Sequence, residues 1–403
     1  MMFGKNRVFA ALLLGAFLVS TVAIATEPEK VELSAEQVIE LNKARAEGKS
    51  LFQKRQYQAA IMSYQRALEI DPNVPTTHYN IGLSYYRLKA YSKSIAAFEK
   101  TVALDKGFVL AHVQIAKSLA KQKNVEAAEA KCMEIKTTFA DSMKYLGEVD
   151  SLLTGSIARE FAKRAQTLGR KRKHTEALAA AQKAVELDPT GFIGHYMCAK
   201  SLVRLKRYDE AKASFEAAFA NSVGKKKAIA ADGIGRIYAQ DARTATKKKR
   251  HTEARKAQEQ AIKYFEFAIE ADPKSGPSYL NLGQSLFEMR RYKKAVDALK
   301  NAERFDKRRS YKAPLKLADA YLALKSFPEA EKAARRSLVR QRQNPSAHMY
   351  LAEALEGQKR LKEAMDEYTH ARRDPRWRPR ATYKLKKLCE ELGNCRKYGI
   401  KLD

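Results

Sequence analysis

The chain has few of the residues that build turns and none of the motifs that mark common active sites. It contains 18 Gly and 11 Pro among 403 residues, whereas Leu, Ala, Lys, Glu and Arg dominate, a balance that favours helix. It has no Gly-rich phosphate loop, no Gly-x-Ser-x-Gly elbow and no His-Glu-x-x-His pair. The sequence therefore predicts an all-helical protein that is not an enzyme and holds no cofactor.

Histidine is also sparse. Four of the seven His occupy equivalent positions in repeated segments: His78, His112, His195 and His348. A residue that recurs at equivalent positions is better explained by repeated packing than by a metal site. We therefore predict no metal site.

The chain has four Cys, and two of them are close in sequence. Cys389 and Cys395 flank Gly393-Asn394, a pair typical of a helix end where the chain turns back. In an oxidising compartment the two Cys would form a disulfide that staples the end of the fold. The alternative is two unpaired thiols.

Acidic residues are outnumbered by basic ones. The sequence has 46 Asp and Glu against 77 Lys and Arg, a formal net charge of +31. Such an excess repels itself in a compact globule and matters less in an elongated array. It predicts an anionic partner: an acidic protein, an anionic polymer of the cell envelope or an anionic lipid surface. Nucleic acid would fit the charge in the cytoplasm, but export argues against it.

Long apolar runs are absent except near the start. Lys5 and Arg7 precede an apolar run from Val8 to Ala25, which ends in Ala23-Ile24-Ala25. A positive start, an apolar stretch and a small-x-small end are typical of a secretory signal. We predict that residues 1–25 are a signal peptide cleaved after Ala25, so that the protein is periplasmic or secreted. The alternative is an uncleaved inner-membrane anchor, because a run of about 18 residues is at the lower edge for a span.

One pattern of large and small apolar residues recurs along the chain. The same spacing is found in two sets, namely Tyr57, Ala60, Ile61, Tyr64 and Ala67, and Tyr292, Ala295, Val296, Leu299 and Ala302. A second pattern, in which a large residue precedes a small one, recurs between such sets, as in Ile81-Gly82 and Leu282-Gly283. Spacings of three and four residues predict helices. Each repeat is therefore a helix pair, in which a small residue of the first helix admits a large residue of the second.

These patterns resemble the tetratricopeptide repeat family, whose period is 34 residues. The resemblance implies an all-α, right-handed superhelical solenoid of antiparallel helix pairs. We place nine repeats at about 41–74, 75–108, 109–142, 158–191, 192–225, 228–275, 276–309, 311–344 and 345–378.

Three segments fit no repeat, and one repeat is too long. Residues 26–40 are interpreted as a lead-in, 143–157 as a joint or extra helix, and 379–403 as a capping helix and tail. The sixth repeat, residues 228–275, is 48 residues long. Its length predicts that both of its helices are longer by about two turns.

The resemblance also implies which residues face a ligand, because the first helices of such arrays line a concave groove. Carried over by position, the predicted peptide or anion groove contains Arg45, Lys49, Tyr79, Asn80, Arg87, Lys117, Lys121, Tyr196, Lys200, Arg204, Arg236 and Asn281. Asn80 and Asn281 match the asparagine that holds the ligand backbone in some members, and an amide offers both donor and acceptor. Arg45 and Lys49 stand where chaperone-binding members have Lys and Asn, so the likeness to their carboxylate clamp is partial.

These features favour a non-catalytic scaffold that binds an acidic or extended peptide partner in the bacterial periplasm or cell envelope. The first alternative is a binding protein for an anionic envelope polymer or membrane surface. The second is a membrane-anchored adaptor that keeps its first helix.

The mass of the mature protein tests the prediction of export. We expect protein purified from its natural source to begin at Thr26, because the small residues before it fit a signal-peptide cleavage site. Intact-mass spectrometry measures this directly. A mature chain that retains residues 1–25 would support the anchored adaptor instead.

Overall fold

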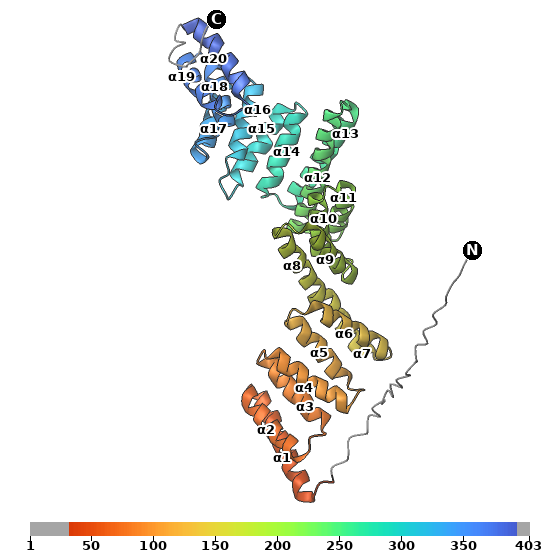
Figure 1. The fold of residues 1–403 in the computed structure, drawn as a ribbon. Helices are drawn as coiled ribbons and strands as arrows, with labels where there is room; N and C mark the ends of the chain where they lie inside the picture. The colour runs from red at the N-terminus through yellow and green to blue at the C-terminus, as the bar shows by residue number, and fades with distance from the viewer. Residues whose placement is uncertain (1–31, 393–403) are drawn as a thin grey trace, which may run out of the picture. The chain divides into compact units, whose positions relative to one another are not determined.

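The structure is a computed structural model that describes residues 32–392. The predicted signal peptide lies outside these residues. The described chain is helical and contains no strand, and its helices follow one another as antiparallel pairs (Figure 1). The predicted all-α solenoid of helix pairs is confirmed. No helix in residues 32–392 is both long enough and apolar enough to cross a bilayer.

Eighteen of the described helices alternate along the chain as the first and second helices of nine repeats. The first helices are α1(Ala35–Gln53), α3(Pro75–Arg87), α5(Val109–Lys121), α8(Ala158–Arg170), α10(Phe192–Arg204), α12(Gly224–Lys247), α14(Gly276–Glu288), α16(Lys312–Ala323) and α18(Pro345–Gly357). The second helices are α2(Tyr57–Ile70), α4(Tyr91–Leu104), α6(Val125–Thr138), α9(His174–Leu187), α11(Tyr208–Ala220), α13(His251–Ala271), α15(Tyr292–Arg304), α17(Phe327–Arg340) and α19(Leu361–Ala371). Outside the pairs are α7(Met143–Ser151), the π-helix η1(Leu152–Ile157) and α20(Arg378–Leu392).

The chain divides into two compact units. Among the described residues, unit 1 comprises residues 32–122 and 133–141, and unit 2 comprises residues 123–132 and 142–392. Inside each unit, consecutive helices pack against each other, as α1 does with α2 and α2 with α3, or α8 with α9 and α9 with α10. First helices of neighbouring pairs also meet, as α8 meets α10 and α16 meets α18. The first helices of a unit therefore lie side by side.

A small residue opposite a large one sets the distance between the two helices of a pair. A methyl group built on Gly82 of α3 would lie 2.5 Å from the ring of Phe98 in α4. In α14, a methyl group on Gly283 would lie 2.6 Å from Leu299 of α15. Phe98 and Leu299 are completely buried. Since protein interiors are close-packed, these helices can approach only because the first one lacks a side chain at that point.

Aspartates in the turns between repeats end the second helices. Asp71, Asp105 and Asp272 follow α2, α4 and α13, and each accepts a hydrogen bond from the backbone N–H two residues later, at 2.9–3.3 Å. Such local bonds compete with continued helix and favour a turn. The chain then reverses into the first helix of the next repeat.

The four equivalent histidines tie these turns to the helices that follow. In each, the ring Nε2–H donates to the backbone carbonyl six residues earlier, at 2.7–3.2 Å: His78 to Pro72, His112 to Lys106, His195 to Pro189 and His348 to Arg342. Repeated packing thus accounts for the recurrence of histidine. In residues 32–392, no group of three or more His, Cys, Asp or Glu could hold a metal ion.

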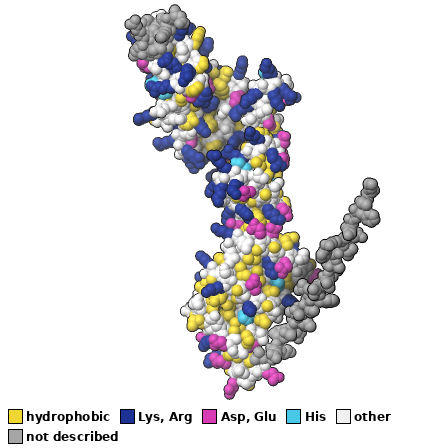
Figure 2. Space-filling view, in the orientation of Figure 1, with side chains coloured by type: hydrophobic (Ala, Val, Ile, Leu, Met, Phe, Trp, Pro, Cys, Tyr) yellow, Lys and Arg dark blue, Asp and Glu magenta, His cyan; other side chains and the backbone are white. Residues whose placement is uncertain are grey.

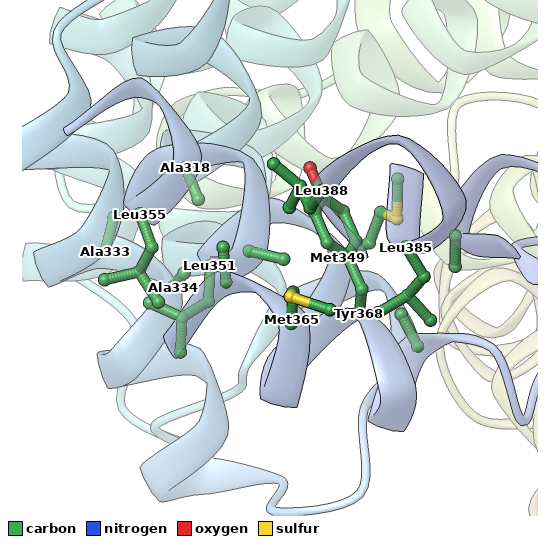
Figure 3. Packing of buried hydrophobic residues seen from close by; sticks show 14 of the residues in the cluster. Ala318, Ala333, Ala334, Met349, Leu351, Leu355, Met365, Tyr368, Leu385 and Leu388 are labelled. Carbon is green, nitrogen blue, oxygen red and sulfur yellow. The ribbon is translucent and has the colours of Figure 1, made fainter. Parts of the chain in front are cut away.

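Helix α20 covers the last helix pair. Figure 3 shows side chains from α18, α19 and α20 meeting in one cluster, which includes Met349, Tyr368, Leu385 and Leu388. All four are at most 2% exposed. Cys389 is also buried here, but Cys395 lies outside the described residues, so the disulfide between them stays a prediction.

Two segments begin or extend differently from ordinary repeats. Helix α1 begins at Ala35, inside the stretch predicted as a lead-in, because Ser34 and Gln37 form a capping box with hydrogen bonds of 2.9 and 3.2 Å. Helices α12 and α13 have 24 and 21 residues, against 13 each for α10 and α11. Lengthening of both helices accommodates the long sixth repeat.

The contact between Gly82 and Phe98 predicts a large effect for a small substitution. We expect Gly82→Ala to lower the free energy of unfolding by about 1–3 kcal/mol, because the added methyl group overpacks the helix interface. Urea unfolding followed by circular dichroism measures this.

Gly147 provides the control, since it is exposed in α7 and a methyl group there would meet nothing within 4 Å. Gly147→Ala should leave the unfolding midpoint unchanged or raise it, because Ala is the better helix former. Equal losses in the two variants would contradict the packing account.

Candidate functional site

Three neighbouring first helices of unit 2 line a groove of about 650 Å³. These helices are α10, α12 and α14, and Asp272 and Ser275 in the turn between α13 and α14 also line the groove. Five of the residues predicted from sequence line this groove: Tyr196, Lys200, Arg204, Arg236 and Asn281. The helices bring these residues together because each occupies a similar place on its own first helix.

The charges in the groove are predominantly positive. Lining residues with a positive charge are Lys200, Arg204, Lys225, Arg236 and Arg243, whereas those with a carboxylate are Asp232 and Asp272. Lys200, Arg204 and Arg236 are exposed. Figure 2 also shows Lys and Arg side chains densely placed over the C-terminal part of unit 2 on the face in view. An anionic ligand would thus enter a favourable field.

Aromatic rings supply the apolar part of the groove. The ring of Tyr196 stacks on Phe192 with centroids 5.5 Å apart and lies 6.1 Å from Phe215. The ammonium group of Lys200 lies 5.4 Å from the centre of the Tyr196 ring, within the range of a cation–π contact. The groove therefore offers both charge and apolar surface to one ligand.

A half-buried aspartate, Asp232, which the sequence reasoning missed, lies among these cations. Asn281 Nδ2 donates to Asp232 Oδ1 at 2.9 Å and so joins α14 to α12. Burial raises the pKa of the Asp232 carboxyl, although the Asn281 hydrogen bond and the Arg236 charge oppose this. One amide N–H of Asn281 is thus engaged within the protein. The sequence did contain a signal for Asp232, because this residue lies four positions before Arg236 and therefore on the same face of α12.

The other seven predicted residues lie on the first helices of unit 1: Arg45, Lys49, Tyr79, Asn80, Arg87, Lys117 and Lys121. Lys49, Arg87 and Lys121 are exposed. Arg45 Nη2 donates to Thr76 Oγ1 at 3.0 Å. The ring of Tyr79 lies 5.5 Å from Phe98 and 5.0 Å from Phe108, so Tyr79 belongs to an aromatic cluster that packs the repeat.

On α16 and α18, the first helices of the last two repeats, acidic side chains form ion pairs or hydrogen bonds within the protein. Arg380 and Lys384 of α20 form ion pairs with Glu353 and Glu356 of α18, at 2.6 and 2.8 Å. The hydroxyl of Tyr350 donates to Asp319 of α16 at 3.0 Å. Helix α20 thereby pairs the Glu353 and Glu356 carboxylates within the protein. In the groove, Arg243 of α12 pairs with Glu288 at 3.5 Å, whereas Lys200, Arg204 and Arg236 are exposed.

The raised pKa of Asp232 predicts a pH-dependent effect of its replacement. Between the unfolded pKa and the raised folded pKa, the native state holds more protons than the unfolded state, so stability falls as pH rises through that range. We expect Asp232→Asn to raise the melting midpoint at pH 7, with a smaller gain near pH 4. Asp297→Asn, at an exposed site on α15, is the control. A gain that does not shrink on acidification would contradict this account.

Family comparisons agree with the helix pairs. A model described as "TPR repeat" matches residues 48–89, and one described as "Tetratricopeptide repeat" matches residues 196–263, 259–309 and 315–376. A second model with the latter description matches residues 75–108 and 161–190.

Several known proteins are similar to parts of the chain. A tetratricopeptide repeat and J domain-containing co-chaperone, DNJ1 of Cryptococcus neoformans, is 30% identical over 174 residues, which are 43% of this chain and 31% of the relative. DnaJ homolog subfamily C member 7 of Mus musculus is 24% identical over 191 residues, or 47% of this chain and 38% of the relative. The chain thus spans about a third of the length of these curated relatives.

Among solved structures, the pilF protein of Pseudomonas aeruginosa matches with a TM-score of 0.44 at 14% identity, covering 58% of this chain and 97% of that one. Proteins of the tetratricopeptide repeat fold generally serve as non-catalytic scaffolds for protein or peptide partners. From the recurring helix pairs and the family models that match along its length, the chain belongs to the tetratricopeptide repeat family.

Proposed function

We propose that this protein is a scaffold that holds an acidic, extended segment of a protein partner in the groove of α10, α12 and α14. The observation that carries the proposal is the composition of that groove, which is lined by five cations, two carboxylates and several aromatic rings. A tetratricopeptide repeat array binds proteins or peptides, and the charge of this groove selects an acidic one.

The size of the groove supports a short stretch of polypeptide. A volume of about 650 Å³ falls within the range of about 300–1,000 Å³ that small ligands occupy. The groove would therefore hold a few residues, and their neighbours would extend beyond it. Aromatic anchors such as Tyr196 favour one apolar side chain among the acidic ones.

The cations would act on both affinity and the rate of encounter. An exposed ion pair contributes about 0.5 kcal/mol, so several are needed for useful selectivity. A cluster of like charges also speeds the approach of an oppositely charged partner, and salt weakens this effect. Binding should therefore be sensitive to ionic strength.

The proposal also includes the cellular location of the protein. The basic start and apolar run of residues 5–25 support export, and we propose that the protein works in the bacterial periplasm or cell envelope. The named co-chaperone relative supports action on other proteins.

A groove variant tests the proposal. We expect Lys200→Gln, Arg204→Gln and Arg236→Gln together to reduce capture of partner proteins from envelope extract by roughly tenfold, because three exposed ion pairs of about 0.5 kcal/mol each are lost. Quantitative mass spectrometry of the captured proteins measures this.

The control removes equal charge from the second helices. Lys294→Gln, Lys300→Gln and Lys332→Gln alter exposed residues of α15 and α17 and should leave capture unchanged. If both triple variants lose the same partners equally, net charge and not the groove governs binding.

A further inference from the structure

The turns within the repeats have Lys or Arg at a position where the backbone is left-handed. Within residues 32–392, ten residues other than Gly have positive φ, between 48° and 65°, and every one is Lys or Arg. Nine of them lie between the first and second helix of a repeat: Arg55, Lys89, Lys123, Arg172, Lys206, Lys249, Arg290, Lys325 and Lys359. The same chemical choice recurs in all nine turns.

The backbone accounts for the conformation but not for the side chain. After α10, Lys206 N–H bonds back to the carbonyl of Val203 at 3.2 Å, and Arg207 N–H to that of Leu202 at 3.0 Å. This closure of a helix end requires a left-handed residue, for which Gly or Asn is the usual choice. A residue with a longer side chain is less favourable there.

Helix dipoles do not explain the choice either. Each turn follows the C-terminus of one helix, where a cation is favourable, and precedes the N-terminus of the next, where a cation is unfavourable. The two effects oppose each other across a turn of a few residues. Local electrostatics therefore gives little reason for a positive charge at this position.

The fold also makes no use of these charges. From α8 onward, the six turn residues of unit 2 are all exposed and form no ion pair with the described part of the chain: Arg172, Lys206, Lys249, Arg290, Lys325 and Lys359. By contrast, the residue that follows is often paired with a glutamate one turn later, as in Lys173–Glu176 at 2.9 Å and Arg207–Glu210 at 2.6 Å. One cation in each turn is thus left for solvent or for a partner.

Five of these residues form what we call the turn row: Arg172, Lys206, Arg290, Lys325 and Lys359. Lys249 projects beyond the row, because the lengthened helices α12 and α13 carry their turn about two helical turns further out, and the step from Lys206 to Arg290 therefore passes over one repeat. Antiparallel helix pairs place every turn within a repeat at the same end, and consecutive pairs of unit 2 stack on one another. Packed helices lie about 8–10 Å apart, so neighbouring turns are separated by a distance on the order of 10 Å. An extended polypeptide covers this distance in about three residues.

We propose that the turn row binds an extended acidic stretch of a partner polypeptide. This inference rests on the proposed function and extends it, because the partner would continue from the groove along this edge of unit 2. A flexible chain with a carboxylate at about every third residue can follow the row around a superhelix, whereas a flat lipid surface would meet only some of its turns.

Binding of fluorescein-labelled poly-L-glutamate to the full chain, followed by fluorescence anisotropy at low salt, tests the turn row. The row variant combines Lys206→Asn, Arg290→Asn, Lys325→Asn and Lys359→Asn. Asn tolerates the left-handed conformation, so the variant should keep or raise the melting midpoint. We expect its affinity for the probe to fall about tenfold.

The matched control removes four exposed cations at the opposite end of the helix pairs: Lys307→Gln, Arg308→Gln, Arg342→Gln and Arg373→Gln. We expect this variant to lose less than about twofold. Equal losses in the row and control variants would overturn the proposal, because the probe would then report only net charge.

Two further arms separate this inference from the function of the groove and from lipid. The four row substitutions should also lower the affinity for the probe when they are added to the groove variant (Lys200→Gln, Arg204→Gln and Arg236→Gln). This loss should be at least half of the loss that they cause in the wild-type chain. If the row variant keeps its affinity for poly-L-glutamate but loses binding to vesicles of anionic phospholipid, the partner is a lipid surface and the proposal is wrong. If the row variant binds the probe as wild type does, the turn row is not a binding surface.

Discussion

The rest of the molecule depends on the close approach of two helices within each repeat, which a missing side chain permits. Gly82 faces Phe98 and Gly283 faces Leu299 at distances that leave no room for a methyl group. This contact fixes how the second helix lies on the first, and so fixes how the next repeat stacks. Because the first helices of a unit lie side by side as a result, residues from α10, α12 and α14 reach one groove.

Charge is distributed unevenly over this regular frame. Near the C-terminus, Arg380 and Lys384 of α20 are used to pair with Glu353 and Glu356. In the groove and in the turns within repeats, cations such as Arg204 and Lys206 form no ion pair within the described residues. An internally paired charge mainly positions its helix, whereas an exposed and unpaired one is available to an anionic partner. We propose that the second kind gives the array its selectivity.

The sequence predicts most of the architecture because the helix pattern is local and repeats. Tyr196, Lys200, Arg204, Arg236 and Asn281 could be placed in one groove from their positions in the repeats together with the resemblance to the family. The Asp232–Asn281 bond could not, since it joins residues 49 positions apart. The aromatic contacts of Tyr79 depend likewise on packing with the next helices. The capping box at Ser34 is a local signal in the sequence. The prediction did not use it and therefore placed the start of the first repeat after the true start of α1.

Site-specific photo-crosslinking tests the central claim, that a partner lies in the groove of α10, α12 and α14. A benzoylphenylalanine at Gln240, which lines the groove, and one at Lys300 on the second helix α15 would be introduced separately into the full chain in its native cells. The account predicts a crosslinked protein at position 240, with an acidic segment at the crosslink, and none at position 300. The same adduct at both positions, or an adduct at position 300 alone, would contradict it.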